Sequence, residues 1–114
     1  MAEPVRVIDA HELKERLDRG DDFKLVNALG EWEFRAKHIP GSLHFAKIED
    51  ALAALKPDDD IVVYCSNPSC LASLLMYREL RKRGFKNVRR FEGGVVGWED
   101  AGYPLEGEWV SRAP

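Results

Sequence analysis

The sequence predicts an α/β protein in which helices cover both faces of a parallel sheet. Short runs rich in β-branched and apolar residues alternate along the chain with stretches whose apolar residues have helical spacing. This alternation is typical of βαβ units with right-handed crossovers. The clearest strand, at residues 61–64, is almost continuously apolar, as expected of a central parallel strand that is covered on both faces. The 114 residues are the size of one domain.

Three strands and three helices are expected in the first half of the chain. Asp9 is a candidate N-cap with Glu12 three residues on, and Gly20 is expected to end the helix that follows. In the second predicted strand–helix pair, Trp32 and Phe34 are expected to be the apolar contacts of a short helix. The expected order is a strand at 5–8, a helix from 9 to 20, a strand at 23–28, a helix at 31–37, a strand at 42–45 and a helix over 48–55.

The second half of the chain predicts two further strands and two further helices. After the strand at 61–64 and a loop, apolar residues at helical spacing predict a long helix that ends at Gly84. A strand within 85–91, a turn at 93–94 and a helix at 95–101 follow. A single domain is expected over residues 1–114, with its core at about 5–105 and an irregular tail at 106–114. The apolar residues that predict the long helix are Leu71, Leu74, Leu75, Met76, Tyr77 and Leu80.

Composition excludes several classes of protein. The formal net charge is −3, whereas a nucleic-acid module is normally basic. No apolar run approaches the ~20 residues that span a bilayer, and the N-terminus lacks the basic start and apolar stretch of a secretory signal. The two cysteines allow at most one disulfide, so a disulfide scaffold is excluded and a reducing, cytoplasmic location is expected.

Cys65 occupies the position at which α/β enzymes usually carry their chemistry. It is the first residue after the predicted central strand, and sites in parallel sheets lie at the carboxyl ends of the strands. A loop that enters a helix gathers backbone N–H groups, and the helix dipole adds positive potential. We therefore expect the pKa of Cys65 to fall below its ordinary value. The alternative is a buried and inert cysteine.

Cys70 lies five residues further along the same loop, and three interpretations compete. It could be an inert small residue, a resolving thiol that forms a disulfide with Cys65, or a metal ligand. The C-x4-C spacing is not the usual zinc pattern, and His38 and His44 fit no standard ligand spacing. No metal or other cofactor is therefore expected. The choice between inert and resolving depends on whether the loop brings the two Cα atoms within disulfide reach.

Other polar residues are weaker candidates. Ser73 either hydrogen-bonds the loop or caps the helix, and capping is the preferred interpretation. The carboxylates at 58–60 precede the central strand, at the wrong end for catalysis, and His11 is expected to be solvated. A basic stretch is interpreted as a solvated helix end rather than as a docking patch; it comprises Arg78, Arg81, Lys82, Arg83, Lys86, Arg89 and Arg90.

Three segments, in this order and at these spacings, make the chain resemble the single-domain rhodanese-like family over about residues 5–105. The first is the strand at 25–28 followed by a short helix and HIPGS at 38–42, and the second is VVYC at 62–65. The third comprises GFKNV at 84–88, EGG at 92–94, Trp98 and AGYP at 101–104.

The resemblance implies a three-layer α/β/α domain around a five-stranded parallel sheet, and it implies a sulfurtransferase. The thiolate of Cys65 would take a sulfane sulfur from thiosulfate or a persulfide donor, and the resulting persulfide would pass that sulfur to cyanide or another thiol. A protein is a further candidate acceptor. Ser73 stands where the family often has a loop-closing hydroxyl. The loop that would cradle the sulfur comprises Ser66, Asn67, Pro68, Ser69, Cys70, Leu71 and Ala72.

The chain also departs from the family pattern. Asn27 and Leu29 stand where many members carry Asp and Arg, and that Arg commonly helps to position an anion or the loop, which puts thiosulfate affinity in question. The loop is longer than usual and has the form Y-C-x4-C-x2-S. Phosphatase-like and arsenate-reductase-like relatives of the fold require Cys-x5-Arg, and Leu71 occupies that position. Two alternative functions are a two-cysteine thiol redox or persulfide-relay protein and a binding module without activity.

Overall fold

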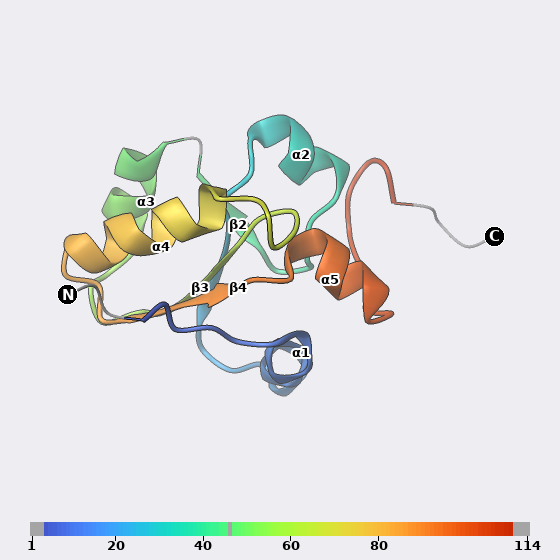
Figure 1. Ribbon diagram of the computed structural model, residues 1–114, viewed down its shortest axis with the longest axis horizontal. Coiled ribbons are helices and arrows are strands. Elements are labelled where there is room, and N and C mark those ends of the chain that lie inside the picture. Colours follow the sequence, from blue (N-terminus) through green and yellow to red (C-terminus); the bar gives the residue numbers. More distant parts are fainter. Residues whose placement is uncertain (1–3, 46, 111–114) are drawn as a thin grey trace.

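Four parallel strands form the sheet in the computed structural model, which describes residues 4–45 and 47–110 (Figure 1). Their order across the sheet is β2-β1-β3-β4, so the strand that precedes Cys65 lies inside the sheet. The predicted α/β class and parallel sheet are confirmed. The strands are β1 (Lys24–Asn27), β2 (Leu43–His44), β3 (Asp60–Tyr64) and β4 (Asn87–Phe91).

Helices cover the sheet on both faces and make three layers. Two separate groups of buried residues lie on the two faces. One group joins the sheet to α1 (Ala10–Arg19) and α5 (Gly94–Asp100), and the other joins it to α3 (Ile48–Ala54) and α4 (Ala72–Lys82). In Figure 1, α1 lies on the opposite side of the strands from α3 and α4. No helix in the described part of the chain is long and apolar enough to cross a membrane.

The strand β3 divides its side chains between these two groups. Because successive side chains of a strand point to opposite faces, Val62 and Tyr64 pack with α1 and α5. Ile61 and Val63 pack with α3 and α4. All four are completely buried, which explains why this strand carries no polar alternation.

The predicted ends of the first helix are confirmed. A carboxylate oxygen of Asp9 accepts a hydrogen bond from the backbone N–H of Glu12 at 2.8 Å, which satisfies a free donor at the start of α1. Gly20 follows the last turn with φ of 71°, a left-handed conformation that suits glycine.

The predicted fifth strand at 5–8 is wrong. Only Val7 forms a bridge, to Arg90, beside the edge of β4. The backbone N–H of Ile8 donates to the Arg90 carbonyl and the Arg90 N–H donates to the Arg6 carbonyl. Asp9 already caps α1, so the chain leaves the sheet after this one pair of hydrogen bonds.

The expected contacts of α2 (Glu31–Ala36) also need correction. This six-residue helix buries none of its residues, and Trp32 is 72% exposed. Trp32 instead packs edge-on against Trp109, at 5.8 Å between ring centroids. The segment 106–110 runs along α2, with Trp109 N–H donating to the Ala36 carbonyl at 3.0 Å. The remainder of the predicted irregular tail, residues 111–114, lies outside the described residues.

Replacing Tyr64 with phenylalanine is expected to destabilise the fold. The Tyr64 hydroxyl accepts a hydrogen bond from the Ile39 N–H at 3.0 Å and lies 2.6 Å from Ser42 Oγ. Its loss leaves a buried N–H without a partner, which costs about 1–3 kcal/mol. Urea unfolding should measure this loss for Tyr64→Phe. The control is Tyr103→Phe, whose hydroxyl forms no hydrogen bond with the described residues, and equal stability of the two variants would contradict the prediction.

The same hydroxyl predicts a pH dependence of stability. Burial raises the pKa of Tyr64 despite hydrogen bonds that oppose the shift. A pKa that is higher in the folded state gives stability below the pKa of the unfolded chain, and this stability is lost as the pH rises through the folded-state value. The stability difference between wild type and Tyr64→Phe should therefore shrink above about pH 10. Urea unfolding at several alkaline pH values tests this, and a constant difference would argue against it.

Candidate active site

Cys65 begins a loop that lies between the first turns of α4 and α5 (Figure 1). The start of α5 holds the first two residues of this loop. The N–H of Val95 donates to the Cys65 carbonyl at 2.9 Å, and that of Val96 donates to the Ser66 carbonyl at 2.8 Å. Gly94 makes the approach possible, because its φ is 64° and a Cβ there would lie 2.5 Å from the Cys65 carbonyl oxygen. The backbone next to Cys65 is thereby fixed.

Asn67 shapes the rest of the loop. Its side-chain oxygen accepts hydrogen bonds from the N–H groups of Ser69 at 2.9 Å and Cys70 at 3.1 Å. Its carbonyl also accepts from the N–H of Cys70. Pro68 and Ser69 are exposed at the tip of this turn. The turn brings the chain back, so that Cys70 returns to Cys65.

The thiol of Cys65 is buried and has two hydrogen-bond acceptors. Sγ lies 3.3 Å from the carbonyl oxygen of Cys70 and 3.1 Å from Oγ of Ser73. Ser73 was expected to cap the helix, and this is wrong. The N-cap of α4 is Leu71, without a side-chain hydrogen bond, whereas Ser73 is completely buried inside the first turn and faces Cys65.

Arg90 connects the loop to the sheet. Its Nε donates to Ser73 Oγ at 2.9 Å, and its Nη2 donates to the carbonyl of Cys70 at 3.0 Å and that of Pro68 at 3.5 Å. Glu92 lies 4.0 Å from Nη1. Arg90 is only 6% exposed, so its assignment to a solvated basic stretch is wrong. Both acceptors of the Cys65 thiol are therefore also acceptors of Arg90.

The position of Arg90 has a sequence signal that the basic-stretch interpretation missed. Val88 is buried on the face that α4 covers. Because side chains alternate along a strand, Arg90 belongs to the same face as Val88. It is also next to the last residue of β4, at the carboxyl edge where the loop lies. A buried cation in that place must be hydrogen-bonded, and its acceptors are the Ser73 hydroxyl and the carbonyl groups of the loop.

The pKa of Cys65 differs from the expectation. Burial raises the pKa of the Cys65 thiol, and the neighbouring Cys70 raises it further. The hydrogen bonds of Ser73 lower it, but they do not outweigh burial. The predicted depression of this pKa is therefore wrong, because the sulfur is enclosed and most of the N–H groups of the loop point elsewhere.

Cys70 receives these N–H groups instead. Burial acts to raise the pKa of Cys70, but the hydrogen bond from Cys65 lowers it, as do the backbone N–H groups of Ala72 and Ser66 and the Ser66 hydroxyl. The net result is a pKa below the ordinary value for a thiol. Cys70 is also more exposed than Cys65. The first proton to leave the pair is therefore that of Cys70.

Asn27 and Leu29 have local structural roles at the end of β1. The Asn27 side-chain oxygen accepts a hydrogen bond from the Leu29 N–H at 2.8 Å, and the Leu29 side chain packs on the core. Nδ2 of Asn27 is buried without a hydrogen-bond partner among the described residues. Position 29 carries an apolar side chain and supplies no guanidinium. The guanidinium that contacts the loop is that of Arg90, on β4.

Two of the three histidines, His38 and His44, form a stack with Phe34. The ring of Phe34 lies between His38, at 4.1 Å between centroids, and His44, at 4.8 Å. Each histidine also hydrogen-bonds a backbone carbonyl. Among the residues that the structure describes, no three His, Cys, Asp or Glu side chains come together as a metal site would need.

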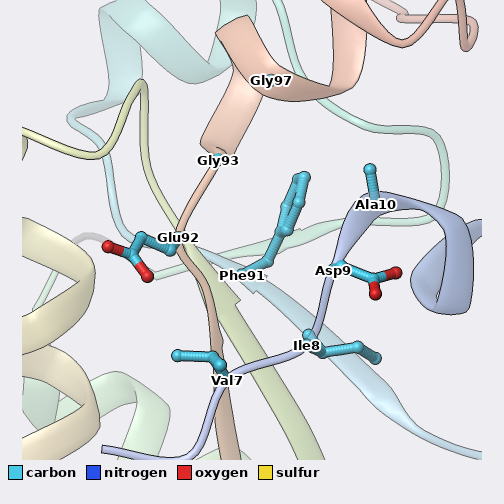
Figure 2. A pocket seen from close by; sticks show the side chains of 8 residues that line it. All are labelled: Val7, Ile8, Asp9, Ala10, Phe91, Glu92, Gly93 and Gly97. Carbon is cyan, nitrogen blue, oxygen red and sulfur yellow. The ribbon is translucent and has the colours of Figure 1, made fainter.

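A pocket of about 360 Å³ lies beside the start of α5 (Figure 2). It is lined by residues 7–10 and by Phe91, Glu92, Gly93 and Gly97, and neither cysteine lines it. Figure 2 shows the Phe91 ring between the segment that leads into α1 and the first turn of α5, whereas the Glu92 side chain points to the other side. The thiol chemistry is thus separate from this pocket.

Comparison with curated proteins finds relatives with several named functions. Thiosulfate sulfurtransferase 18 of Arabidopsis thaliana is 30% identical over 123 residues, which cover 94% of this chain and 88% of the relative. The HTH-type transcriptional regulator Rv0324 of Mycobacterium tuberculosis is 33% identical over 93% of this chain, and the match spans 47% of the regulator's length. The dual specificity phosphatase Cdc25 of Arabidopsis thaliana is 30% identical over 78% of this chain and 70% of its own length.

Solved structures give the same fold. The rhodanese-like domain of the Anabaena protein Alr3790 matches with a TM-score of 0.83 and 30% identity, over 99% of this chain and 86% of that one. A thiosulfate sulfurtransferase from Pseudomonas aeruginosa matches in fold, with a TM-score of 0.78 and 24% identity, over 90% of this chain and 20% of that one. The family profile of the rhodanese-like domain matches residues 9–101. The chain therefore belongs to the rhodanese-like family.

Proposed function

We propose that the protein is a sulfurtransferase in which Cys65 carries a sulfane sulfur as a persulfide. The donor is thiosulfate or a persulfide, and the acceptor is thiophilic. One observation carries this proposal: the Cys65 thiol follows the central strand and contacts Ser73 and the Cys70 carbonyl, both of which Arg90 holds. The similarity to a thiosulfate sulfurtransferase over nearly the whole chain supports it.

The thiolate of Cys65 forms by proton transfer within the pair of cysteines. The pKa of Cys70 is lowered and that of Cys65 is raised, so a Cys70 thiolate is the neighbouring base that can take the proton of Cys65. Ser73 then stabilises the new anion. A hydroxyl both donates and accepts, and because Ser73 Oγ already accepts from Arg90 Nε, its proton is free to point at the sulfur of Cys65. Arg90 thereby acts on the sulfur through Ser73.

Sulfur transfer proceeds in two displacement steps. The Cys65 thiolate attacks the outer sulfur of thiosulfate, a sulfur–sulfur bond forms at Cys65, and sulfite leaves with the electron pair of the bond that breaks. An acceptor nucleophile then attacks the outer sulfur of the persulfide, and the thiolate of Cys65 leaves. Cyanide gives thiocyanate, and a thiol, including one on a protein, gives a new persulfide. Covalent catalysis of this kind divides one transfer into two easier steps.

Access to Cys65 requires movement of the loop. The residue is 1% exposed, and the loop from 66 to 71 begins beside it. The tip at Pro68 and Ser69 is exposed and is the part of the loop that a donor or acceptor meets first. With Leu29 in place of an arginine, anion binding depends on the backbone N–H groups of the loop and on the α4 dipole. We therefore expect weak thiosulfate binding and a preference for a persulfide donor.

Phosphoryl transfer is disfavoured by the positions of the cations. A cysteine phosphatase needs a guanidinium that faces the oxyanion. Leu71 occupies the required position and is 60% exposed. The Nε and Nη2 donors of Arg90 bind Ser73 and the loop carbonyls. They are therefore occupied in holding the loop and are not directed at a phosphate oxyanion. We therefore do not propose a phosphatase activity for this chain, although one of its relatives is named a dual specificity phosphatase.

We also propose a reducing, cytoplasmic setting and a single catalytic domain. Both cysteines are free thiols, and a reducing compartment keeps them available for sulfur chemistry. The family match at 9–101 spans both cysteines, Ser73 and Arg90, so one domain holds the whole proposed site.

Incubation with thiosulfate, or separately with glutathione persulfide, should add one sulfur atom to the protein. Intact mass spectrometry after rapid removal of the donor measures this addition. Cys65→Ser should abolish it, because the serine hydroxyl cannot form a persulfide. The prediction fails if both the wild type and Cys70→Ser form no adduct. It also fails if Cys65→Ser still forms the adduct.

Removal of the Ser73 hydroxyl should shift the ionisation of Cys65. In a Cys70→Ser background only Cys65 reacts with iodoacetamide, and its rate follows the thiolate fraction. Ser73→Ala removes a hydrogen bond that lowers the pKa of Cys65, so the rate-against-pH curve should move to higher pH. Sulfur transfer from glutathione persulfide should fall at least about tenfold, since a hydrogen bond to a charged group contributes about 1.5–3 kcal/mol.

A matched control separates this effect from damage to α4. Leu75 is on the same helix and is 61% exposed, so Leu75→Ala should leave both the alkylation curve and the transfer rate unchanged. An unchanged curve for Ser73→Ala would show that the hydroxyl does not act on Cys65.

A further inference from the structure

We infer that Cys70 is a resolving thiol, which attacks the persulfide on Cys65, releases hydrosulfide and leaves an intramolecular disulfide. This inference rests on the proposed persulfide at Cys65. It adds a second outcome for the bound sulfur, which is release as sulfide rather than transfer to an acceptor.

The geometry of the loop brings the two cysteines together. Sγ of Cys65 lies 3.3 Å from the carbonyl oxygen of Cys70, and each cysteine affects the pKa of the other. Both are free thiols. A disulfide needs Cβ atoms about 3.5–4.5 Å apart, and the turn already brings the backbone of Cys70 to the sulfur of Cys65.

Three hydrogen bonds hold Cys70 in this place. Its N–H group donates to the backbone carbonyl and to the side-chain oxygen of Asn67. Its carbonyl accepts from Arg90 Nη2 at 3.0 Å. These contacts involve the backbone, so the side chain of Cys70 remains free to react.

The surroundings of Cys70 also favour a nucleophile. Backbone N–H groups of Ser66 and Ala72 and the hydroxyl of Ser66 donate to its sulfur. Such donors stabilise a thiolate, and the thiolate is the species that attacks a sulfur–sulfur bond. Cys70 is partly exposed whereas Cys65 is buried, so the second thiol is also the one that an external reductant can reach.

The resolving step is balanced without an external oxidant. The Cys70 thiolate attacks Sγ of Cys65, which is the inner sulfur of the persulfide. The bond between Sγ and the outer sulfur breaks, and hydrosulfide leaves with the electron pair. The two cysteine sulfurs are oxidised to a disulfide, and the sulfane sulfur is reduced to sulfide. A small-molecule thiol such as glutathione, or a dithiol, then reduces the disulfide and restores both thiols.

The lifetime of the persulfide tests this step. Reduced wild type, Cys70→Ser, Cys70→Ala and Cys65→Ser are each mixed with one equivalent of glutathione persulfide and freed of donor. Samples are alkylated at intervals for intact mass, and released sulfide is measured. Both Cys70 variants keep the backbone carbonyl that Arg90 and Cys65 contact, so they remove the thiol alone. Their one-sulfur adduct should last at least about tenfold longer than that of wild type.

Wild type should instead lose the mass of two hydrogen atoms and release one sulfide for each chain that reacts. Peptide mapping should find Cys65 joined to Cys70. Equal adduct lifetimes in wild type and the Cys70 variants would overturn the inference and leave the proposed sulfur transfer intact. Because Cys70 also accepts the Cys65 proton, the Cys70 variants are assayed at alkaline pH as well, where Cys65 ionises without that base. If they acquire no adduct there, the proposed function itself fails, and the resolving role fails with it.

A donor-independent measurement checks the geometry separately. Oxidation of the reduced wild-type protein with diamide requires no persulfide and should give the same disulfide between Cys65 and Cys70. Absence of that disulfide would overturn the inference whatever the outcome of the sulfur-transfer assay, because the two sulfurs would then not reach bonding distance.

Discussion

The guanidinium of Arg90 is a buried cation with its donors directed at the loop after β3. Enclosing a charge costs several kcal/mol unless it is paired and hydrogen-bonded. The Ser73 hydroxyl and the carbonyls of Pro68 and Cys70 supply that compensation. Two of these three acceptors contact Sγ of Cys65. This one cation therefore joins the loop, Ser73 and the surroundings of the Cys65 thiol.

The register of the parallel sheet explains why Arg90 lies where it does. Arg90 pairs with Val63 and Phe91 pairs with Tyr64, so Arg90 is level with a residue two positions before Cys65. Its long side chain spans the remaining distance to the carboxyl edge. In this chain β4 supplies the guanidinium that fixes the loop, while Leu29, beyond β1, packs on the core. The loop can thus be held without an arginine at position 29.

Features that depend on local pattern could be predicted from the sequence, and features that depend on contacts between distant segments could not. The continuous apolar run before Cys65 and the Asp9 cap act within a few residues, so the central strand, the first helix and the placement of the thiol were predictable. The Ser73–Arg90 hydrogen bond joins residues 17 positions apart, and no local pattern specifies it.

The segment at 5–8 has the composition of a strand, but the chain turns into α1 at Asp9, so only a single bridge to the sheet forms. The pKa order of the thiols depends on where the N–H groups of the loop point, and residue types do not specify that direction.

The carbonyl of Cys70 determines which form of Cys65 the resting structure favours. A carbonyl oxygen accepts hydrogen bonds, so at 3.3 Å from Sγ it stabilises the protonated thiol and repels a thiolate. The carbonyl therefore opposes ionisation of Cys65, and in the proposed sulfur transfer the same loop also has to move before a donor can reach the buried sulfur. A single displacement of residues 66–71 would relieve both constraints. Arg90 donates a hydrogen bond to this carbonyl, so it opposes that displacement and favours the protonated thiol.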